Sequence, residues 1–389
     1  MIEVTANLAR GSTFLAGEIL ECYITLINTD REEKRNLAYN DCTLAWASAQ
    51  IHCQCAVSDS RVVLPKSDIL STEDVTSTGD QTSFVPSKGE RGLTVWSSKP
   101  KILFCDLRLG PGEQKTYLYK EGIPKDVPPS FKGQSVKYSY KLTIGTQKLE
   151  CPARLLRVPF RVLVLYGLND LNVYASGEEV TPSNPFLEQR PPENTLLEVA
   201  LQVLSTVTAK RSPHCFNITN ARGKVARLCM FKQAFKIGED IVGTFDFSDA
   251  SIPCVQFSAT LQSEEQISEE CRKKPGQLPI TMSYCKHQDF CLHSRKTHFS
   301  LPIPLSASPG FISDIVTLKW KIHFEFITSQ NAIPPHAAPS NPAECSTWRG
   351  PENLEVETMV WDLPIKVFPT NPLHASNVSL LKTSSMVEM

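Results

Sequence analysis

Two stretches of the chain alternate strictly between apolar and polar residues. The first covers residues 136–144 and the second covers residues 316–326. A period of two is typical of a strand with one face in a core and the other face in solvent, so both stretches predict strands of antiparallel sheets. We expect the large side chains on the apolar face of these strands to be buried, namely Tyr138, Tyr140, Leu142, Trp320, Ile322 and Phe324.

These strands belong to an internal duplication of the chain. Residues 14–26 resemble residues 235–247, because both open with an aromatic residue, then Gly-Glu, then an alternating strand, at an offset of 221 (238 − 17). The alternating strands repeat at an offset of 180 (316 − 136), and two closing strands with a proline repeat at 205 (364 − 159). The order of elements is kept while the spacing changes, as expected when loops vary around a repeated core. The duplication predicts an all-β protein with two tandem antiparallel β-sandwiches.

The duplication also indicates where the domains begin and end. We expect the first sandwich over residues 1–170, with a Ser-, Thr-, Asp- and Gly-rich insert at about 65–100. The second sandwich is expected over residues 213–370, after a linker of residues 171–212. Residues 371–389 are polar and terminal, so we predict a flexible tail there.

The linker contains the one short helix that the sequence predicts, at about residues 195–208. Two prolines precede Asn194 and Thr195, either of which can cap the helix, and apolar residues then follow at helical spacing. The apolar face is broader than an exposed linker helix needs, so the helix either docks onto its own sandwich or binds a partner protein. The polar face lacks the Lys and Arg of a membrane-surface helix. The candidate partner-binding residues are Leu197, Leu201, Leu204 and Val207.

Composition and charge exclude several classes of protein. The 389 residues include 40 Lys and Arg against 41 Asp and Glu, a net charge of −1 that lacks the basic signature of a nucleic-acid partner. The most apolar run, residues 155–168, contains two arginines and is too short to span a bilayer. The first residues do not form a signal peptide. We therefore interpret the 13 cysteines as reduced thiols of a cytoplasmic protein.

The sequence contains no motif of an enzyme: it has no G-x-S-x-G elbow, phosphate-binding loop or G-x-G-x-x-G turn, so no catalytic residue or cofactor is predicted. Cys285, His287, Cys291 and His293 could ligate zinc, but their spacing departs from the common patterns and the segment resembles a polar loop, so no metal site is predicted. Cys53 and Cys55 alternate on one strand face and are expected to be buried thiols.

Basic and acidic residues also cluster in the second half of the chain. Residues 272–274 and 295–296 are basic and could form a binding patch. Glutamates close to them in the sequence dilute this charge, so a solvated charged loop is the favoured interpretation. The glutamates are Glu264, Glu265, Glu269 and Glu270.

The repeated motif and several longer blocks resemble known proteins. The tandem halves that open with an aromatic residue and Gly-Glu resemble the arrestin fold, and glycine at this point permits a tight turn with positive φ. The blocks at residues 101–113, 131–145, 322–328 and 361–367 resemble the Rgp family. That family is the arrestin-like, non-catalytic partner in the Ric–Rgp complex, a guanine-nucleotide exchange factor for the Rab-six GTPase at the Golgi. The resemblance runs from residue 1 to about residue 372.

This resemblance implies a function in a complex. It implies a heterodimer with a large β-propeller-containing Ric-type subunit, which this chain stabilises, and binding of the Rab-six GTPase. It further implies a cytoplasmic protein peripherally recruited to Golgi membranes for retrograde endosome-to-Golgi transport. We expect an exposed sheet edge to capture the extended tail of the Rab by strand addition.

The alternative interpretation is an arrestin-type cargo or ubiquitin-ligase adaptor. Adaptors that recruit ubiquitin ligases commonly carry Pro-Pro-x-Tyr. The nearest segment here runs Pro128-Pro-Ser-Phe131 and ends in phenylalanine instead of tyrosine. The motif is therefore incomplete, which favours the exchange-complex interpretation.

Overall fold

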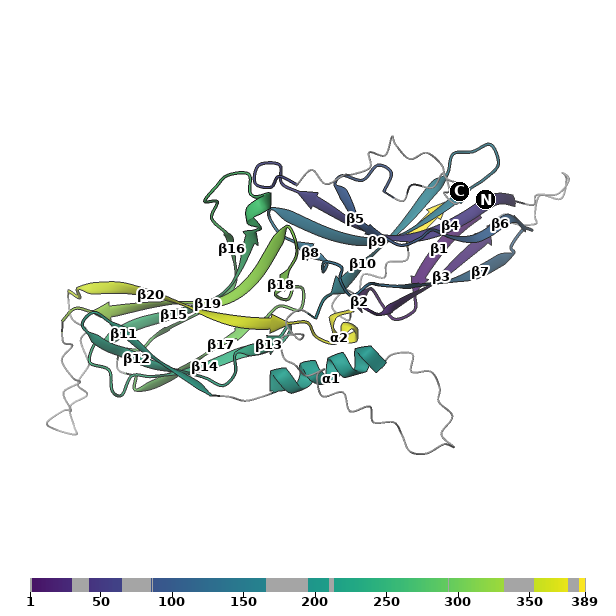
Figure 1. Cartoon of the computed structure of the whole chain (residues 1–389). Helices are drawn as coiled ribbons and strands as arrows, with labels where there is room; N and C mark the ends of the chain where they lie inside the picture. Colours follow the sequence, from purple (N-terminus) through teal and green to yellow (C-terminus); the bar gives the residue numbers. More distant parts are fainter. Residues whose placement is uncertain are drawn as a thin grey trace, which may run out of the picture.

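Two β-sandwiches lie side by side in a computed structural model of the chain, as the sequence predicted (Figure 1). Each sandwich consists of two sheets, and the two chain ends lie together at the far end of the first sandwich (Figure 1). The all-β prediction is confirmed. The structure describes residues 2–29, 42–64, 85, 87–165, 195–209, 213–292, 294–331, 353–376 and 385–388.

The N-terminal sandwich is built from a four-stranded and a seven-stranded sheet. The smaller sheet has the order β21 (Ser385–Glu388), β1 (Ile2–Leu8), β3 (Ile19–Asn28) and β7 (Gln114–Gly122). The larger sheet has the order β2 (Thr13–Leu15), β10 (Arg154–Leu163), β9 (Val136–Gln147), β4 (Cys42–Val57) and β5 (Leu93–Ser97). In addition, β6 (Lys101–Leu109) pairs with β4, and β8 (Phe131–Lys132) pairs with β9.

The C-terminal sandwich repeats this plan with a four-stranded and a six-stranded sheet. The smaller sheet has the order β11 (His214–Asn220), β12 (Gly223–Met230), β14 (Asp240–Asp246) and β17 (Lys296–Pro302). The larger sheet has the order β13 (Ala234–Lys236), β20 (Val356–Phe368), β19 (Val316–Ser329), β15 (Cys254–Ile267) and β16 (Ile280–Phe290), with β18 (Phe311–Ile312) paired to β19. The helices are α1 (Thr195–Ala209), the 3₁₀ turn η2 (Glu269–Cys271) and α2 (Pro372–Ser376).

The period-two residues of β9 and β19 form the cores of the two sandwiches. All six side chains that the alternation placed inside are at most 3% exposed. In the second core, Phe245 is surrounded by other aromatic rings, with centroids at 4.7 Å from Phe257 and 5.5 Å from Phe326. Burial of these apolar side chains provides the main driving force for each sandwich.

The duplication extends to the register of the strands. Pro159 of β10 lies opposite Lys141, and Pro364 of β20 lies opposite Lys321, which is the same pairing at the predicted offset of 180 (321 − 141). In both halves a short strand, β2 or β13, pairs in parallel with the closing strand. The internal repeat therefore extends to the register of the central and closing strands.

The Gly-Glu motif forms the same turn in both halves. Gly17 and Gly238 have φ of 95° and 86°, the left-handed region that glycine adopts without strain. Each following glutamate accepts a hydrogen bond from the backbone N–H three residues before it, from Leu15 to Glu18 and from Lys236 to Glu239. The motif therefore specifies the turn that starts a core strand.

Two predicted irregular segments contain regular elements. The expected tail of residues 371–389 includes α2 and also β21, which pairs antiparallel with the edge of β1. The expected insert at 65–100 includes β5, which pairs with β4. Strands as short as these carry too few residues for a clear periodic pattern, and pairing with the backbone of a neighbouring strand orders them instead.

Candidate functional site

The predicted linker helix α1 packs against its own chain. Leu204 is 1% exposed and forms a small apolar cluster with Val203 and Phe368 of β20. Leu201 and Val207 are partly buried against the same cluster. The side chain of Leu197 lies outside the described residues. This packing supports the docking alternative for the helix, and the binding of a partner protein by the same residues stays a prediction.

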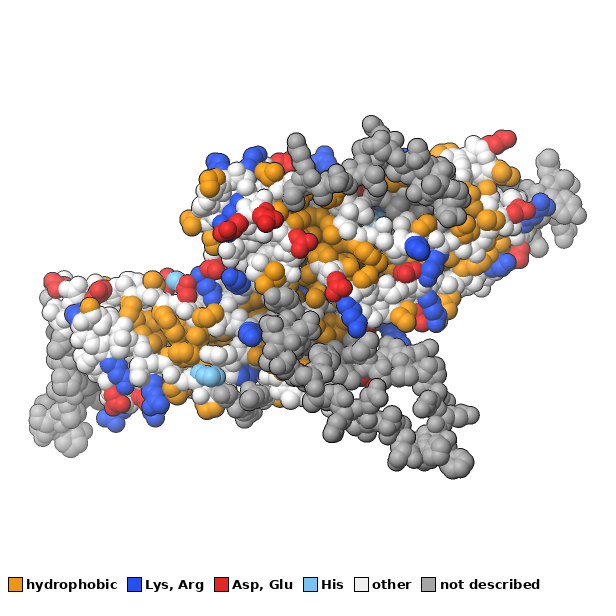
Figure 2. Space-filling view, viewed as in Figure 1, with side chains coloured by type: hydrophobic (Ala, Val, Ile, Leu, Met, Phe, Trp, Pro, Cys, Tyr) orange, Lys and Arg blue, Asp and Glu red, His pale blue; other side chains and the backbone are white. Residues whose placement is uncertain are grey.

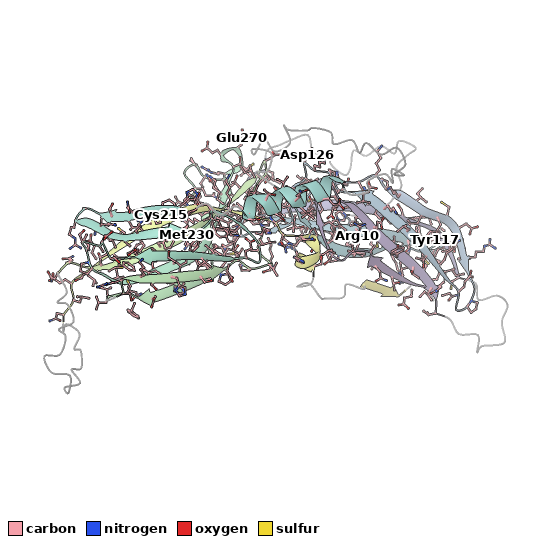
Figure 3. All side chains as sticks on the ribbon, turned by 90° about the horizontal axis from the view of Figure 1, so that it is seen from below. Arg10, Tyr117, Asp126, Cys215, Met230 and Glu270 are labelled. Atoms are coloured by element: carbon pink, nitrogen blue, oxygen red, sulfur yellow. The ribbon has the colours of Figure 1, made fainter. Side chains whose placement is uncertain are left out.

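The C-terminal end of α1 meets a surface hollow of about 540 Å³. The Lys232 ammonium donates to the carbonyl oxygen of Thr208 at 3.2 Å and to Glu239 at 2.7 Å. A cation at this end of a helix interacts favourably with the helix dipole. Phe231 and Val242, which are 47% and 39% exposed, border the hollow. The protein surface next to this end of the helix is therefore partly apolar. Figure 3 shows α1 alongside the junction of the two sandwiches.

A buried carboxylate joins the two sandwiches. Glu265 of β15 is 5% exposed, and its carboxylate accepts backbone N–H groups from the first sandwich. The donors are Gln134 at 2.7 Å, Ser135 at 2.8 Å and Val136 at 3.1 Å. Hydrogen bonds to a charged acceptor are stronger than neutral ones, and buried N–H groups that lose their acceptor are costly. Glu265 therefore holds the β8–β9 turn against the second sandwich.

Further contacts extend this junction, which we call the seam. The rings of Phe131 and Phe311, equivalent residues of the two halves, meet edge-on with centroids 5.1 Å apart. Tyr138 and Ser313 share a hydrogen bond of 3.2 Å between their hydroxyl groups. The guanidinium of Arg161 donates to the carbonyl oxygens of Leu305 at 2.9 Å and Ala307 at 2.7 Å. The seam thus combines apolar packing with directed hydrogen bonds.

The charged segment around residues 264–274 lies partly in an exposed loop, as expected, and partly at the seam. Val62 bridges to Arg272, and the backbone N–H of Lys273 donates to the carbonyl oxygen of Arg61 at 3.0 Å. Lys273, Lys274 and Glu269 are exposed, so the solvated-loop interpretation holds for them, and Glu265 in β15 is the exception. Along β15, Leu261, Ser263, Glu265 and Ile267 share one buried face. A glutamate in phase with buried positions was the signal that could have identified Glu265.

An exposed strand edge lies beside the seam. Ile280, Met282 and Tyr284 of β16 line a hollow of about 220 Å³ together with Glu265 and residues of the β8–β9 turn. Within the described residues, β16 pairs with β15 and with no strand on its other side. Its residues 280–285 carry no charge, and charges are the usual protection of an edge. Figure 2 shows apolar patches on the visible face of both sandwiches.

The candidate metal ligands do not converge. Cys285 and His287 lie in β16, so the polar loop expected here is a strand. The Cys285 thiol donates to the carbonyl oxygen of Pro302, the His287 ring stacks on Phe257, and the buried Cys291 thiol donates to the carbonyl oxygen of Cys254. His293 lies outside the described residues. Among the residues that are described, no group of three or more potential ligands is arranged to hold a metal ion.

Two other sequence features are buried in the first sandwich. Cys53 and Cys55 are 0% and 1% exposed, as predicted, and burial raises their pKa values to about 12 and about 11. The Pro128–Phe131 segment ends at the seam, where Phe131 is 6% exposed. The Tyr140 hydroxyl donates to the carbonyl oxygen of Pro128. This segment is therefore used to complete the fold.

A second buried carboxylate attaches the insert to the first sandwich. Glu90 accepts hydrogen bonds from Lys141 at 2.5 Å and His52 at 3.2 Å, and Arg157 lies 3.1 Å away. Burial alone would raise the pKa of Glu90, but the hydrogen bonds from Lys141 and His52 outweigh it and hold this pKa below its usual range. Burial lowers the pKa of His52. The cluster is thus an ion pair between Glu90 and basic side chains, with a buried histidine beside it.

Comparisons with known proteins identify the family. A family model described as Rgp1 matches residues 66–170 and 178–329. The RAB6A-GEF complex partner protein 2 of Homo sapiens is 48% identical over 387 residues, which cover 97% of each chain. The protein with the same name from Bos taurus is 48% identical over 377 residues, covering 94% of this chain and 93% of its own. In the described part of the chain, no helix is long and apolar enough to cross a membrane. The chain belongs to the Rgp1 family.

Proposed function

We propose that this chain is a regulatory binding subunit of a guanine-nucleotide exchange complex that acts on a RAB6A-type GTPase. The observation that carries the proposal is the 48% identity to the human complex partner protein over 97% of both chains. This identity extends over the lengths of both sandwiches. The proposal therefore concerns the whole chain and not one module.

In this proposal the chain itself is not catalytic. Opening the nucleotide site of a Rab requires displacement of the switch segments and of the Mg²⁺–phosphate contacts. We assign that step to a larger, β-propeller-containing Ric-type partner, which this chain stabilises and orients. The complex would act at the Golgi, on peripherally recruited protein, in retrograde transport. The seam supports the scaffolding part, since hydrogen bonds such as those to Glu265 fix one sandwich relative to the other.

The edge of β16 is the proposed site for the Rab tail. An extended peptide can add to an exposed edge through main-chain hydrogen bonds, while pockets for alternate side chains give specificity. The β1 edge is paired with β21, whereas the Ile280–Cys285 part of β16 is uncharged and borders the seam hollow. Binding there would place the tail next to both sandwiches, since residues of both line the hollow.

Affinity purification from cells followed by mass spectrometry tests the subunit role. The full-length chain should recover a large β-propeller-containing protein together with a Rab of the RAB6A type. Recovery of ubiquitin ligases and no Rab would contradict the proposal and favour an adaptor. The matched control is a variant with an exposed charge reversed far from β16, Arg108→Glu, which should recover the same proteins.

A tail exchange tests the β16 site separately. Exchange on the native Rab and on the Rab with a foreign tail would be compared with both proteins held on liposomes by an artificial anchor. We expect slower exchange with the foreign tail, and Met282→Lys in β16 should remove the difference by placing a charge on the edge. Equal rates with both tails would contradict the tail site and leave the scaffold role intact.

A further inference from the structure

Two cysteines face each other on the outer surface of the second sandwich. Cys215 of β11 and Cys229 of β12 are directly opposite in the antiparallel register, and their Sγ atoms lie 2.6 Å apart. Cys215 is exposed and Cys229 is partly exposed. Opposite residues of an antiparallel pair have Cα atoms about 4.5–5.5 Å apart, within the range of about 4.4–6.8 Å that a disulfide spans. The two thiols can therefore be joined without movement of the strands.

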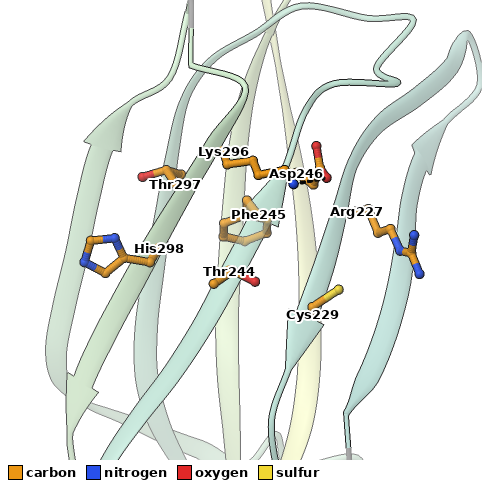
Figure 4. A pocket seen from close by; sticks show the side chains of 8 residues that line it. All are labelled: Arg227, Cys229, Thr244, Phe245, Asp246, Lys296, Thr297 and His298. Atoms are coloured by element: carbon orange, nitrogen blue, oxygen red, sulfur yellow. Dashed lines mark ion pairs between the residues drawn. The ribbon is translucent and has the colours of Figure 1, made fainter.

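Charged side chains surround this thiol pair. Arg227 lies two residues before Cys229 on β12, and both line a hollow of about 410 Å³ with Asp246 and Lys296 (Figure 4). The hydrogen bond from Cys229 and the Arg227 guanidinium hold the pKa of Cys215 below its ordinary value. Burial and the shared hydrogen bond raise the pKa of Cys229. Cys215 is therefore the cysteine that ionises more readily, and Cys229 is the neighbouring thiol.

The other exposed cysteines among the described residues differ in their surroundings. Cys105 of β6 lies opposite Trp46, and Cys151 lies in the turn between β9 and β10. Neither of these two thiols faces a second cysteine in the described strand pairings. They share solvent access with Cys215 but have no thiol opposite them, so they are internal controls.

We propose that Cys215 and Cys229 form a reversible redox site that is modified to an intrachain disulfide by oxidants of the peroxide class. The Cys215 thiolate attacks one peroxide oxygen, the O–O bond breaks, and a sulfenic acid forms while the leaving oxygen takes up a proton as water. The Cys229 sulfur then attacks the Cys215 sulfur, the S–O bond breaks, and a second water leaves. Two thiols are oxidised by two electrons and one peroxide is reduced to two waters. A dithiol reductant reverses the reaction by exchange.

The disulfide would fix an edge of the sheet. β11 is the edge strand of its sheet and follows α1 in the chain. A covalent link at Cys215 would hold the start of this strand to β12 and restrict fraying there. Oxidation would therefore change the stability of the strand that connects the helix to the second sandwich.

Intact-mass measurement of the full chain treated with hydrogen peroxide tests the proposal. Free thiols are alkylated after treatment, and peptides are mapped without reduction. We expect a cross-linked peptide pair containing Cys215 and Cys229, the loss of two alkylations, and their return after dithiothreitol. Cys105 and Cys151 should stay alkylated under the same conditions. Alkylation of Cys215 and Cys229 to the same extent as these controls, with no cross-link, would overturn the proposal.

Two variants separate the roles of the sulfurs. Cys229→Ser should stop the reaction at the sulfenic acid of Cys215, which a cyclic diketone traps. Cys215→Ser should give neither the cross-link nor the trapped product at Cys229. Arg227→Gln should move the pH profile of Cys215 alkylation to higher pH. A trapped sulfenic acid at Cys229 in place of Cys215 would contradict the assigned order.

Discussion

The two sandwiches share their core positions but differ in the turns that meet at the seam. Tyr140 and Trp320 occupy the same position at the offset of 180 (320 − 140), and both are buried. The Tyr140 hydroxyl donates to the carbonyl oxygen of Pro128, and the Trp320 ring N–H donates to that of Ser308, again 180 residues apart (308 − 128). The core and even its side-chain hydrogen bonds are therefore shared by the two halves.

The backbone N–H groups of the β8–β9 and β18–β19 turns have different hydrogen-bond acceptors. The backbone N–H of Val316 donates to the hydroxyl of Ser313 in its own turn. Gly133 is the equivalent of Ser313 and has no side chain, so the N–H of Val136 donates to Glu265 of the other sandwich. Cys55 is the equivalent of Glu265, because their partners Tyr138 and Leu318 are 180 residues apart (318 − 138). A side chain of the second sandwich thus supplies the acceptor that the turn of the first sandwich lacks.

Trp320→Ala should have the largest effect on stability, because it opens a cavity in the second core and removes the bond to Ser308. We expect a loss of about 3–5 kcal/mol in the free energy of unfolding, measured by denaturant titration. Tyr140→Phe removes the corresponding bond without a cavity and should cost about 1 kcal/mol. Equal losses for the two variants would contradict the cavity as the main cost of Trp320→Ala.

Glu265→Ala should destabilise the seam by about 3 kcal/mol, since it leaves three backbone N–H groups without their charged acceptor. Cys55→Ala at the equivalent position removes only a small thiol and should cost about 1 kcal/mol. Hydrogen exchange of the amides of residues 134–136 gives the local measurement. Unchanged protection of these amides in Glu265→Ala would contradict the role of the carboxylate.

A serine at position 133, as at the equivalent Ser313, tests the same comparison further. A side chain at Gly133 would meet the Glu265 carboxylate, with Cβ at 2.5 Å from Oε2, so Gly133→Ser alone should be destabilising. In the Glu265→Ala background the clash with the carboxylate is absent, although the close contact of the new Cβ with Cε1 of Phe131 at 2.5 Å remains. The new hydroxyl can then accept the Val136 N–H as Ser313 does for Val316. The double variant should therefore be more stable than the sum of the single changes, by about 1–2 kcal/mol. Simple additivity would contradict the equivalence of the two turns.

Helix α1 breaks the symmetry in another place. It packs on Phe368, whose equivalent in the first half is Leu163, at the offset of 205 (368 − 163), and Leu163 packs with the core of the second sandwich. Leu204→Asp should detach the helix at a cost of about 2–4 kcal/mol, seen as faster proteolysis of the linker. Gln202→Asp on the exposed face is the matched control. Loss of partner binding by Leu204→Asp with normal protease resistance would instead support a partner-binding face.

Acid should weaken the first sandwich at its Glu90 cluster. The pKa of His52 is lowered by burial, so the stability that neutral His52 provides is present above about pH 6.5 and falls as the pH decreases below that value. The lowered pKa of Glu90 adds stability that is lost only at more acidic pH, below about 4. Melting temperature from pH 7 to pH 5 should fall less in His52→Gln. An identical slope in this variant would exclude His52 as the cause.

Periodicity and repetition predicted most of the fold. They did not predict contacts between segments that are distant in the sequence. The alternation around Tyr140 and Trp320 gave the core faces, since burial imposes a period of two on a strand. The β21–β1 pairing and the role of Glu265 depend on which backbone groups meet in space. The residues next to Glu265 in the sequence do not indicate which groups it binds. Only its position in phase with the buried residues of β15 indicated that it is buried. The facing of Cys215 and Cys229 likewise follows from strand register.

The release of labelled GDP from a RAB6A-type GTPase tests the central functional claim most directly. Four reactions are compared, with the GTPase alone, with this chain, with the large partner, and with both. We predict acceleration that requires the large partner and reaches its full rate only when this chain is also present. Full acceleration by this chain alone, from a preparation checked for contaminants, would contradict the account, as would an equal rate for the large partner with and without it.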